Sequence, residues 1–504
     1  PAENPPRGDE PMRRQEQTGW GGLAAMGFVL FAAGMELART ATPEPPCHLE
    51  PPCPLESRGE GEVCPTGPVD ESMPGGAMPS RLGVASCSAS SCHGGPKGTN
   101  HAVSTFAATL WMERDPHARA SEVLHSGRSR RMAELLGIGP AHQAHRCLVC
   151  HSMADLSPTP LPDDLVADGV GCASCHGNPT AWGSEHTLDA WKRMGREERA
   201  ALGYRDLSTP LDRVNNCTRC HVGDAEHDVD HALIAAGHPR LVFEFAAYQK
   251  RYPRHWRPAG RAEVGTDFKA RSWAVGQAAT LAATARLLEA RVSDPPARAT
   301  SAVPGGRWPE FAEFDCQGCH RSIASVAPPS VDAVRPGWSA IGTPAWQPWT
   351  QAGGALLSGN SADGDLDAGL ADLRRLLERH WGPADQTRRG RVRLQARALA
   401  GAAARRAEAL EALDEVDLDD VATKIEALVA EGGPGIGSWE AAVQSVLALE
   451  AVLDGGPAQL GNTERNDVDR HLEGLRESLR YPPRQETPPT LRRSDFKRLR
   501  ATVP

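Results

Sequence analysis

The chain is poor in aromatic residues and in lysine. Its 504 residues include 12 Trp, 9 Phe and 4 Tyr, so aromatic side chains fill only a small part of a core of this size. Lysine accounts for six of the 55 basic residues, and the formal net charge is -9. Because a nucleic-acid partner requires a basic face, the sequence predicts no nucleic-acid partner.

Long apolar runs and strand-like alternation are also scarce. The main apolar run, residues 19–35, has 17 residues, which is the lower limit for one membrane span. Hydrophobic residues (40%) and charged residues (24%) are near the averages for globular proteins. These values exclude a polytopic membrane protein and wholesale disorder. The length and the lack of alternation predict a mainly α protein of about two to four domains.

Cysteine and histidine, in contrast, are concentrated in one part of the chain. Ten of the 13 Cys and 15 of the 18 His lie between residues 81 and 323. The pattern C-x-x-C-H occurs there four times, at residues 147–151, 172–176, 217–221 and 316–320. A random chain of this composition would contain roughly 0.01 copies of the pattern, so chance does not account for it.

The C-x-x-C-H spacing is typical of covalently attached c-type haem. Two thiols form thioether bonds to one haem, and the adjoining His becomes the proximal ligand of the iron. Zinc sites also use C-x-x-C pairs, but they do not require a His after every second Cys. A disulfide framework is also disfavoured, because cysteines two residues apart rarely bridge except in redox motifs. The sequence therefore predicts haem c at these four sites.

A fifth site has a less regular spacing. Four residues separate Cys87 from Cys92, and His93 follows, so the loop between the thioethers has to bulge outward. The alternative is a local disulfide beside an unrelated His. With this site the prediction is five haems. The covalent ligands are then Cys87, Cys92, Cys147, Cys150, Cys172, Cys175, Cys217, Cys220, Cys316 and Cys319, and the proximal ligands are His93, His151, His176, His221 and His320.

Haem c is attached outside the cytoplasm, so we expect an export signal and a periplasmic location. Residues 19–36 follow Arg13 and Arg14 and suit either a cleaved signal peptide or an uncleaved inner-membrane anchor, with residues 1–18 cytoplasmic. Residues 37–80 are rich in proline and indicate a linker. The three remaining cysteines lie there, and one disulfide plus one free or intermolecular thiol is the expected arrangement, with a metal site beside His48 as the alternative.

The rest of the chain divides into three further segments. Residues 81–325 form the predicted pentahaem domain, in which residues 271–292 indicate a helix that ends before Pro295 and Pro296. Residues 326–360 indicate a second linker, and residues 361–504 a helical C-terminal domain. In this last segment Leu366, Leu370, Leu373 and Leu377 recur at helical spacing and mark one apolar face.

The order of motifs between residues 81 and 221 resembles the multihaem cytochrome c554 family. The first attachment site is followed by Trp111 and by the segment Asp-Pro-His-Ala-Arg-Ala that begins at Asp115. The third site lies in the segment Gly-Val-Gly-Cys-Ala-Ser-Cys-His-Gly that begins at Gly169, and His186 comes ten residues after His176. The resemblance implies a loop-rich, mainly helical domain built around a haem stack, and it leaves the C-terminal domain unexplained.

The resemblance also implies a set of distal iron ligands. His117 and His186 match family positions that coordinate haems attached elsewhere in the chain, and the haem on His151 matches one that lacks a distal protein ligand. The residues themselves add His231 and His238, which flank a helical apolar stretch. His101 completes the set of distal candidates, and His255 is left out of it.

Irons with two His ligands have no open position, so the predicted function is electron transfer between redox partner proteins through five mostly bis-His haems. One alternative is a haem enzyme acting on a small nitrogen or sulfur compound at an open iron on His151, with Arg146 or the cluster Arg128, Arg130 and Arg131 supplying positive charge. Another is an electron-transfer subunit of a membrane complex. We expect a carrier rather than an enzyme.

Overall fold

The computed structural model describes residues 83–96, 103–153, 161–257, 268–293, 308–316, 345–357, 364–378, 386–413 and 439–455, and single positions between 466 and 479. Several predicted features lie outside these residues. They are the segments 1–18, 19–36 and 37–80, three of the haem-site residues (Cys319, His320 and His101), and the linker cysteines Cys47, Cys53 and Cys64.

The described part of the chain is helical, which confirms the mainly α prediction. It contains no β-strand beyond an isolated bridge between Phe314 and Trp346. The α-helices are α1 (Ala107–Arg114), α2 (Gly127–Leu136), α3 (His145–His151), α4 (Asp163–Ala167), α5 (Cys172–His176), α6 (Asp189–Arg193), α7 (Arg196–Ala201), α8 (Pro210–His221), α9 (His231–Ala236), α10 (Phe245–Arg251), α11 (Phe268–Val292), α13 (Pro348–Leu357), α14 (Gly364–Glu378), α15 (Gln386–Glu411) and α17 (Trp439–Gly455). Among the 3-10 helices are η2 (Val84–Ser86), η4 (Pro116–Arg119) and η9 (Phe311–Glu313).

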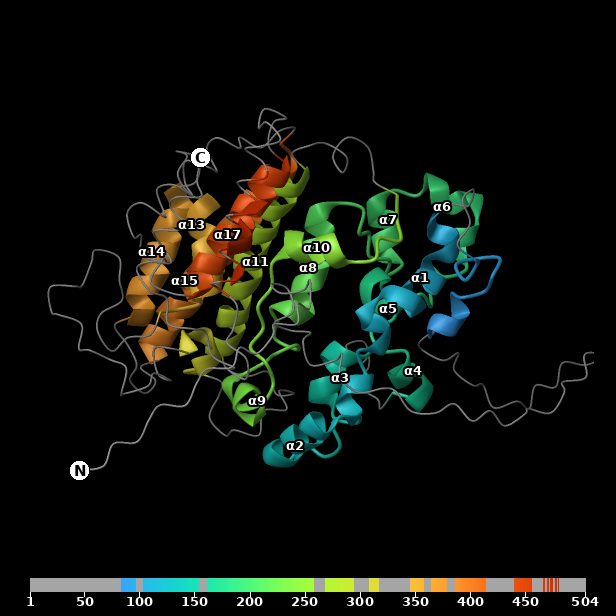
Figure 1. Cartoon of the computed structure of the whole chain (residues 1–504), viewed down its shortest axis with the longest axis horizontal. Helices are drawn as coiled ribbons and strands as arrows, with labels where there is room; N and C mark the ends of the chain where they lie inside the picture. The colour runs from blue at the N-terminus through green and yellow to red at the C-terminus, as the bar shows by residue number, and fades with distance from the viewer. Residues whose placement is uncertain are drawn as a thin grey trace, which may run out of the picture.

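The helices divide into two groups that differ in length (Figure 1). The short helices α1 to α7 and long loops make one half of the molecule, and the long helices α11, α14, α15 and α17, together with the ten-residue α13, make the other. Helices α8 and α10 lie between the two halves. Short helices with long connections are expected where bound groups, rather than helix faces, fill the interior.

Helix α11 is the centre of the long-helix half. Twenty of its 25 residues are buried, which is the behaviour of a helix that is apolar on all sides. Its first half packs with residues of α8, α10, α13 and α17, including Val214, Phe245 and Val446. Its second half packs with α14 and α15. The expected helix over residues 271–292 is therefore present, and it belongs to the same core as the C-terminal helices.

The predicted leucine stripe of α14 faces this core. Leu366, Leu373 and Leu377 are buried, and the partly buried Leu370 packs against the same cluster. Helix α13 lies in the stretch 326–360 that indicates a linker, and its Trp349 donates a hydrogen bond from Nε1 to the carbonyl oxygen of Phe243 (2.8 Å). This contact ties α13 to the segment that leads into α10.

The short-helix half has only a small apolar core of its own. Its buried cluster consists of Leu124, Ala133, Ala141, Leu148 and Val166. Local caps hold several of the helices instead: Ser126 caps α2 at its start, and Gly137 ends α2 in the left-handed conformation (φ 62°) that glycine adopts at low cost. The remaining interior of this half is a cavity, described below.

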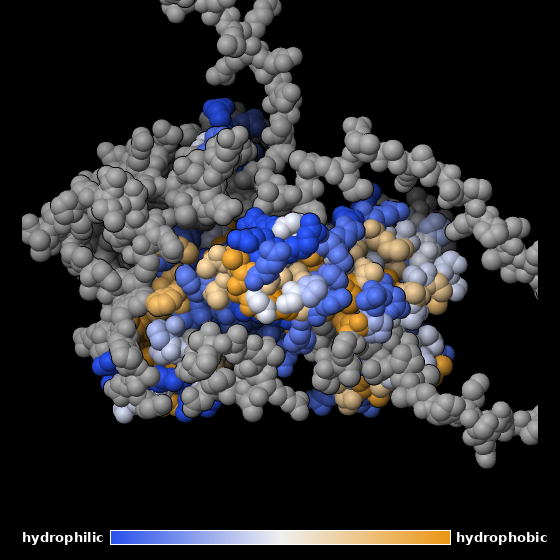
Figure 2. Space-filling model, turned by 90° about the horizontal axis from the view of Figure 1, so that it is seen from below, coloured by the Kyte–Doolittle hydropathy of each residue, from blue (hydrophilic) through white to orange (hydrophobic). Residues whose placement is uncertain are grey.

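The exposed large apolar side chains are few and come from separate parts of the chain. On the face that carries α2 and α9, seen from below in Figure 2, hydrophilic residues are interspersed with smaller apolar groups. None of the described helices is both long and apolar enough to cross a membrane.

Candidate haem-binding site

Three attachment motifs lie at the C-terminal ends of helices. Helices α3, α5 and α8 each end on the His of a motif: His151, His176 and His221. Residues three and four apart share a face of a helix, so the two Cys and the His of each motif lie on one side. The local fold therefore presents each motif as a unit.

The first attachment site, with its longer spacing, has no helix. Cys87 follows the 3-10 helix η2, and the residues between the two cysteines form a turn whose outer positions, Ser90 and Ser91, are exposed. The turn closes tightly, because a Cβ on Gly94 would lie 1.8 Å from the carbonyl oxygen of Ser88. The extra residues thus bulge toward solvent while Cys87 and His93 face inward.

All four of these motifs open onto one cavity with a volume of about 1490 Å³. Apolar side chains such as Trp111, Val149 and Leu233 supply much of its wall. The eight cysteines and four proximal histidines of the four motifs line it as well: Cys87, Cys92, Cys147, Cys150, Cys172, Cys175, Cys217 and Cys220, with His93, His151, His176 and His221. All nine described cysteines, these eight and Cys316, are free thiols. An apolar cavity edged by paired thiols and imidazoles fits covalently attached haem.

Each proximal histidine of the cavity faces a second histidine at a nearly constant separation. The pairs and the distances between their ring centroids are His93 and His186 (6.1 Å), His221 and His117 (6.1 Å), His151 and His238 (6.4 Å), and His176 and His255 (6.3 Å). Two imidazoles on opposite sides of one metal ion, each with its nitrogen about 2 Å from the metal, have centroids roughly 6 Å apart. The separations therefore match the space for one iron between each pair.

A directly stacked pair elsewhere in the chain shows the contrast. The rings of His125 and His142 are 4.5 Å apart and nearly parallel, with an interplanar angle of 24°. Such a spacing leaves no room for a metal between the rings. The four pairs in the cavity are wider by 1.6 Å or more, and three of them are close to perpendicular, at 74° to 79°.

Hydrogen bonds fix which nitrogen of several rings is free to bind a metal. Nδ1 of four rings lies against a backbone carbonyl oxygen: His93 at Ser104 (2.6 Å), His151 at Ala120 (2.8 Å), His186 at Gly183 (2.5 Å) and His238 at Pro239 (2.8 Å). A carbonyl oxygen can only accept, so Nδ1 carries the proton in each ring. Nε2 is then the unprotonated nitrogen, as iron ligation requires.

Burial keeps several of these rings neutral. It lowers the pKa of His176 and His238 to about 4 and the pKa of His221 to about 3. Their neighbours with positive charge, such as His117 beside His221, lower the pKa further. Neutral imidazole is the form that binds a metal. At pH 7 these three rings are therefore available as ligands without losing a proton first.

His117 differs from the other rings because its partner is a carboxylate. Its Nδ1 lies 2.8 Å from Oδ1 of Asp115, which is 1% exposed. Burial raises the pKa of Asp115, but hydrogen bonds from the side chain and backbone of His117 outweigh burial and the net pKa is lowered. Burial likewise lowers the pKa of His117, and Asp115 raises it above its ordinary value. The Asp115 carboxylate is therefore ionised.

Cysteines of different motifs lie close to one another. The Cys87 thiol hydrogen-bonds with Cys172, and the Cys150 thiol with Cys220. Cys175 is close enough to Cys217 for its charge to raise the pKa of the Cys217 thiol, in addition to the larger effect of burial. The four attachment sites therefore adjoin in the order first, third, fourth and second.

Some of the predicted distal candidates line the cavity in the structure, and others do not. His117, His186 and His238 line the cavity and face proximal rings. His231 lies outside this cavity, with its ring 5.6 Å from that of Phe311. His255 was left out of the prediction, yet it faces His176. No local motif marks it, and the one signal in the sequence was that each proximal ring needs a partner.

The last attachment site is described only at Cys316. Its Sγ lies 3.8 Å from Nη1 of Arg240, and Arg240 also lines the cavity of the other four sites. The fifth attachment site thus begins beside the cavity wall.

The comparisons with known proteins agree with this geometry. Residues 86–177, which include the first three attachment sites, match the family described as cytochrome c554 and c-prime. No match was found among curated proteins or among solved structures. The matched segment carries most of the residues on which the resemblance depends, including Cys87, His117 and His176, whereas His186 lies just beyond it. The protein is therefore similar to the cytochrome c554 family, whose members are c-type cytochromes that take part in electron transfer.

Proposed function

We propose that the chain is a pentahaem c-type cytochrome that transfers electrons in the periplasm. The four histidine pairs, each separated by 6.1–6.4 Å, carry this proposal. Two imidazoles on one iron leave no coordination position for a substrate, so such a site exchanges electrons without binding a reactant.

Each residue type then has one role. The cysteine pairs anchor the haems, and the histidines that follow them are the proximal ligands. The distal ligands opposite His93, His151, His176 and His221 are His186, His238, His255 and His117. For the fifth haem, on Cys316, Cys319 and His320, His231 and His101 are the remaining distal candidates. Bound haem supplies a one-electron couple, and the apolar cavity wall excludes water from it.

The contacts between cysteines support a continuous path for electrons. Because Cys87 adjoins Cys172, Cys175 adjoins Cys217, and Cys220 adjoins Cys150, we expect the first, third, fourth and second haems to follow one another at close range. Because Cys316 contacts Arg240 of the cavity wall, we expect the fifth haem to lie beside the same cavity. Electron transfer over the length of the cavity then proceeds in short steps.

The enzyme hypothesis requires an open iron on His151, and His238 stands opposite that ring. The arginines considered as substrate-binding charges are engaged with the protein. Arg146 forms an ion pair with Asp230, Arg128 donates to the carbonyl oxygen of Gly237 (2.8 Å), and Arg130 donates to that of His125 (2.6 Å). These contacts favour a structural role for this positive charge.

The periplasmic location rests on the chemistry of haem c, which is attached outside the cytoplasm, and on the apolar segment at residues 19–36. The partners we propose are redox proteins that deliver and remove single electrons. Retention of the segment as an anchor would hold the cytochrome at the inner membrane.

Two measurements on the purified holoprotein test the proposal. A pyridine haemochrome assay is expected to give five haems per chain, and electron paramagnetic resonance of the oxidised protein is expected to show only low-spin ferric haem. A high-spin signal that changes on addition of nitrite, hydroxylamine or nitric oxide would contradict the electron carrier and support the enzyme. A count of four would remove the irregular site at Cys87 and Cys92.

A further inference from the structure

Asp115 is placed to act on the iron that His117 faces. Its Oδ1 accepts two hydrogen bonds from His117, one from Nδ1 (2.8 Å) and one from the backbone N–H (3.0 Å). The side chain also caps η4, and it is almost fully buried. The carboxylate is therefore held in one position relative to the His117 ring.

The other rings of the four pairs lack such a partner. Nδ1 of His93, His151, His186 and His238 meets a neutral backbone carbonyl. Among the described residues, His117 alone of the eight paired rings forms an ion pair with a carboxylate. One haem in the cavity thus has a distinct ligand environment.

A carboxylate that accepts a hydrogen bond from an imidazole changes how strongly the imidazole binds iron. A hydrogen bond from Nδ1 to a carboxylate raises the basicity of the ligand, and a more basic ligand binds Fe(III) more strongly relative to Fe(II). The buried negative charge acts in the same direction, because the oxidised iron carries one more positive charge. Both effects stabilise the oxidised haem.

We propose that Asp115 is a positioning residue that lowers the reduction potential of the haem held between His221 and His117. The inference rests on the proposed function, since it requires haem at this site. Asp115 would then adjust the potential of the fourth haem. From the cysteine contacts we expect this haem to lie between the third and the second.

The test compares Asp115→Asn with Asp224→Asn by spectroelectrochemical titration of the holoproteins. Asparagine keeps an acceptor for both hydrogen bonds and removes the charge. In Asp115→Asn, the ratio of reduced to oxidised haem at a fixed potential is expected to rise about tenfold for one haem, equivalent to about 59 mV for a one-electron couple.

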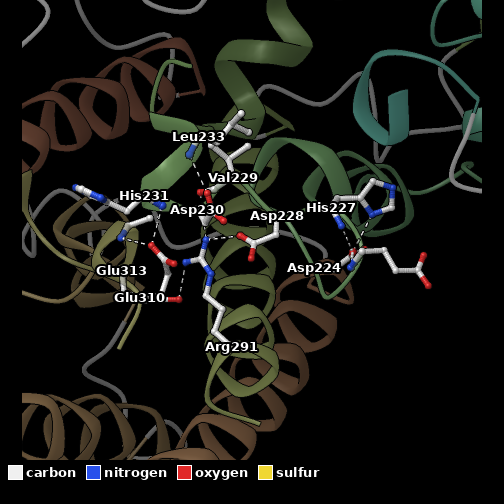
Figure 3. Close-up of polar contacts among 12 residues, drawn as sticks. Asp224, His227, Asp228, Val229, Asp230, His231, Leu233, Arg291, Glu310 and Glu313 are labelled. Carbon is white, nitrogen blue, oxygen red and sulfur yellow. Dashed lines mark hydrogen bonds and ion pairs between the residues drawn. The ribbon is translucent and has the colours of Figure 1, made fainter. Parts of the chain in front are cut away.

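Asp224→Asn is the matched control. Asp224 makes the same contact to Nδ1 of the buried His227 (2.8 Å, Figure 3), and His227 does not line the cavity. We expect a clearly smaller shift in this variant. An equal shift in both variants, or none in Asp115→Asn, overturns the inference.

Different results contradict the role of Asp115 and the proposed function. Five haems, all low-spin, with no shift in Asp115→Asn would overturn the role of Asp115 alone, whereas a wrong haem count or spin state would contradict the proposed function. If Asp115→Asn does not attach its haems, near-infrared magnetic circular dichroism of the unmodified protein tests the role of Asp115 instead. One bis-His haem is expected to give its charge-transfer band at higher energy than the others, and coincident bands would refute the inference.

Discussion

In the proposed cytochrome, His238 is the distal ligand of the second haem. Its ring faces that of His151 at 6.4 Å, and the contact of Nδ1 with Pro239 leaves Nε2 free. Replacement of His238 by alanine removes the distal ligand and opens one coordination position. We expect one haem in five to become high-spin in the ferric state and to bind carbon monoxide when reduced, as measured by electron paramagnetic resonance and absorption spectroscopy.

A histidine outside the cavity provides the control for this variant. His125 stacks on His142 at 4.5 Å and faces no proximal ring, so His125→Ala is expected to leave all haems low-spin. Unchanged spin states in His238→Ala would show that another group ligates the second haem.

Single residues were predictable where chemistry fixes the spacing and less so where only the fold brings them together. Four of the five predicted attachment sites follow from a five-residue pattern, because both thioethers and the proximal ligand belong to one haem, whereas the site at Cys87 was predicted from its four neighbours. Distal ligands come from distant segments, so no local pattern identifies them. The family resemblance predicted His186 and His117, whereas His255 faces His176 only after the chain has folded.

At the scale of elements, a buried ion-pair network holds η9 and the segment before α9 against α11. Arg291 of α11 contacts Glu313 (2.7 Å), which lies in η9, and Asp228 (2.5 Å), which lies between α8 and α9 (Figure 3). Arg291 is 2% exposed and Glu313 is fully buried. Trp346 Nε1 completes the network by donating to Glu313 (2.7 Å). The network therefore fixes α9 and η9 against the long central helix.

Removal of one partner leaves uncompensated buried charges. In Arg291→Leu, Glu313 and Asp228 would lose their counter-ion, and we expect the free energy of unfolding to fall by about 3–5 kcal/mol. Urea denaturation followed by circular dichroism measures this change.

Arg397→Leu is the control for that substitution. Arg397 of α15 pairs with Glu289 of α11 (2.7 Å), but its side chain is 69% exposed. An exposed ion pair contributes about 1 kcal/mol or less. Equal losses in the two variants would indicate that the network in Figure 3 is as hydrated as a surface pair.

The elements were predictable in proportion to their length. The helix expected over residues 271–292 is α11, and the leucine stripe is the buried face of α14. The short helices α3 and α5 span seven and five residues, too few for a periodic pattern to be distinct. Helix α13 was not predicted, since it lies in a proline- and glycine-containing stretch. Its burial comes from tertiary contacts such as that of Trp349 with Phe243.

At the scale of the whole molecule, the two halves differ in what fills their interiors. The long helices bury one another through Trp273, Leu288 and Val446. The short helices surround a cavity of about 1490 Å³ and have a small apolar cluster centred on Leu148. An apolar cavity of this size is not stable when empty, because its walls gain by collapsing together. The low aromatic content of the sequence agrees with haem as the main filling of this half.

This difference predicts how the chain behaves without haem. We expect the chain produced in cells that lack haem attachment to lose ordered structure in helices α1 to α7, because binding free energy contributes to folding there. The long helices α11, α14, α15 and α17 bury apolar faces against one another and need no haem to do so. Limited proteolysis with mass spectrometry is expected to show cleavage in helices α1 to α7 and resistance in the long helices, with α8 and α10 protected where they pack on α11. The holoprotein, treated in parallel, should resist cleavage in both halves. Equal resistance of helices α1 to α7 with and without haem would mean that the short helices hold their arrangement by their own contacts.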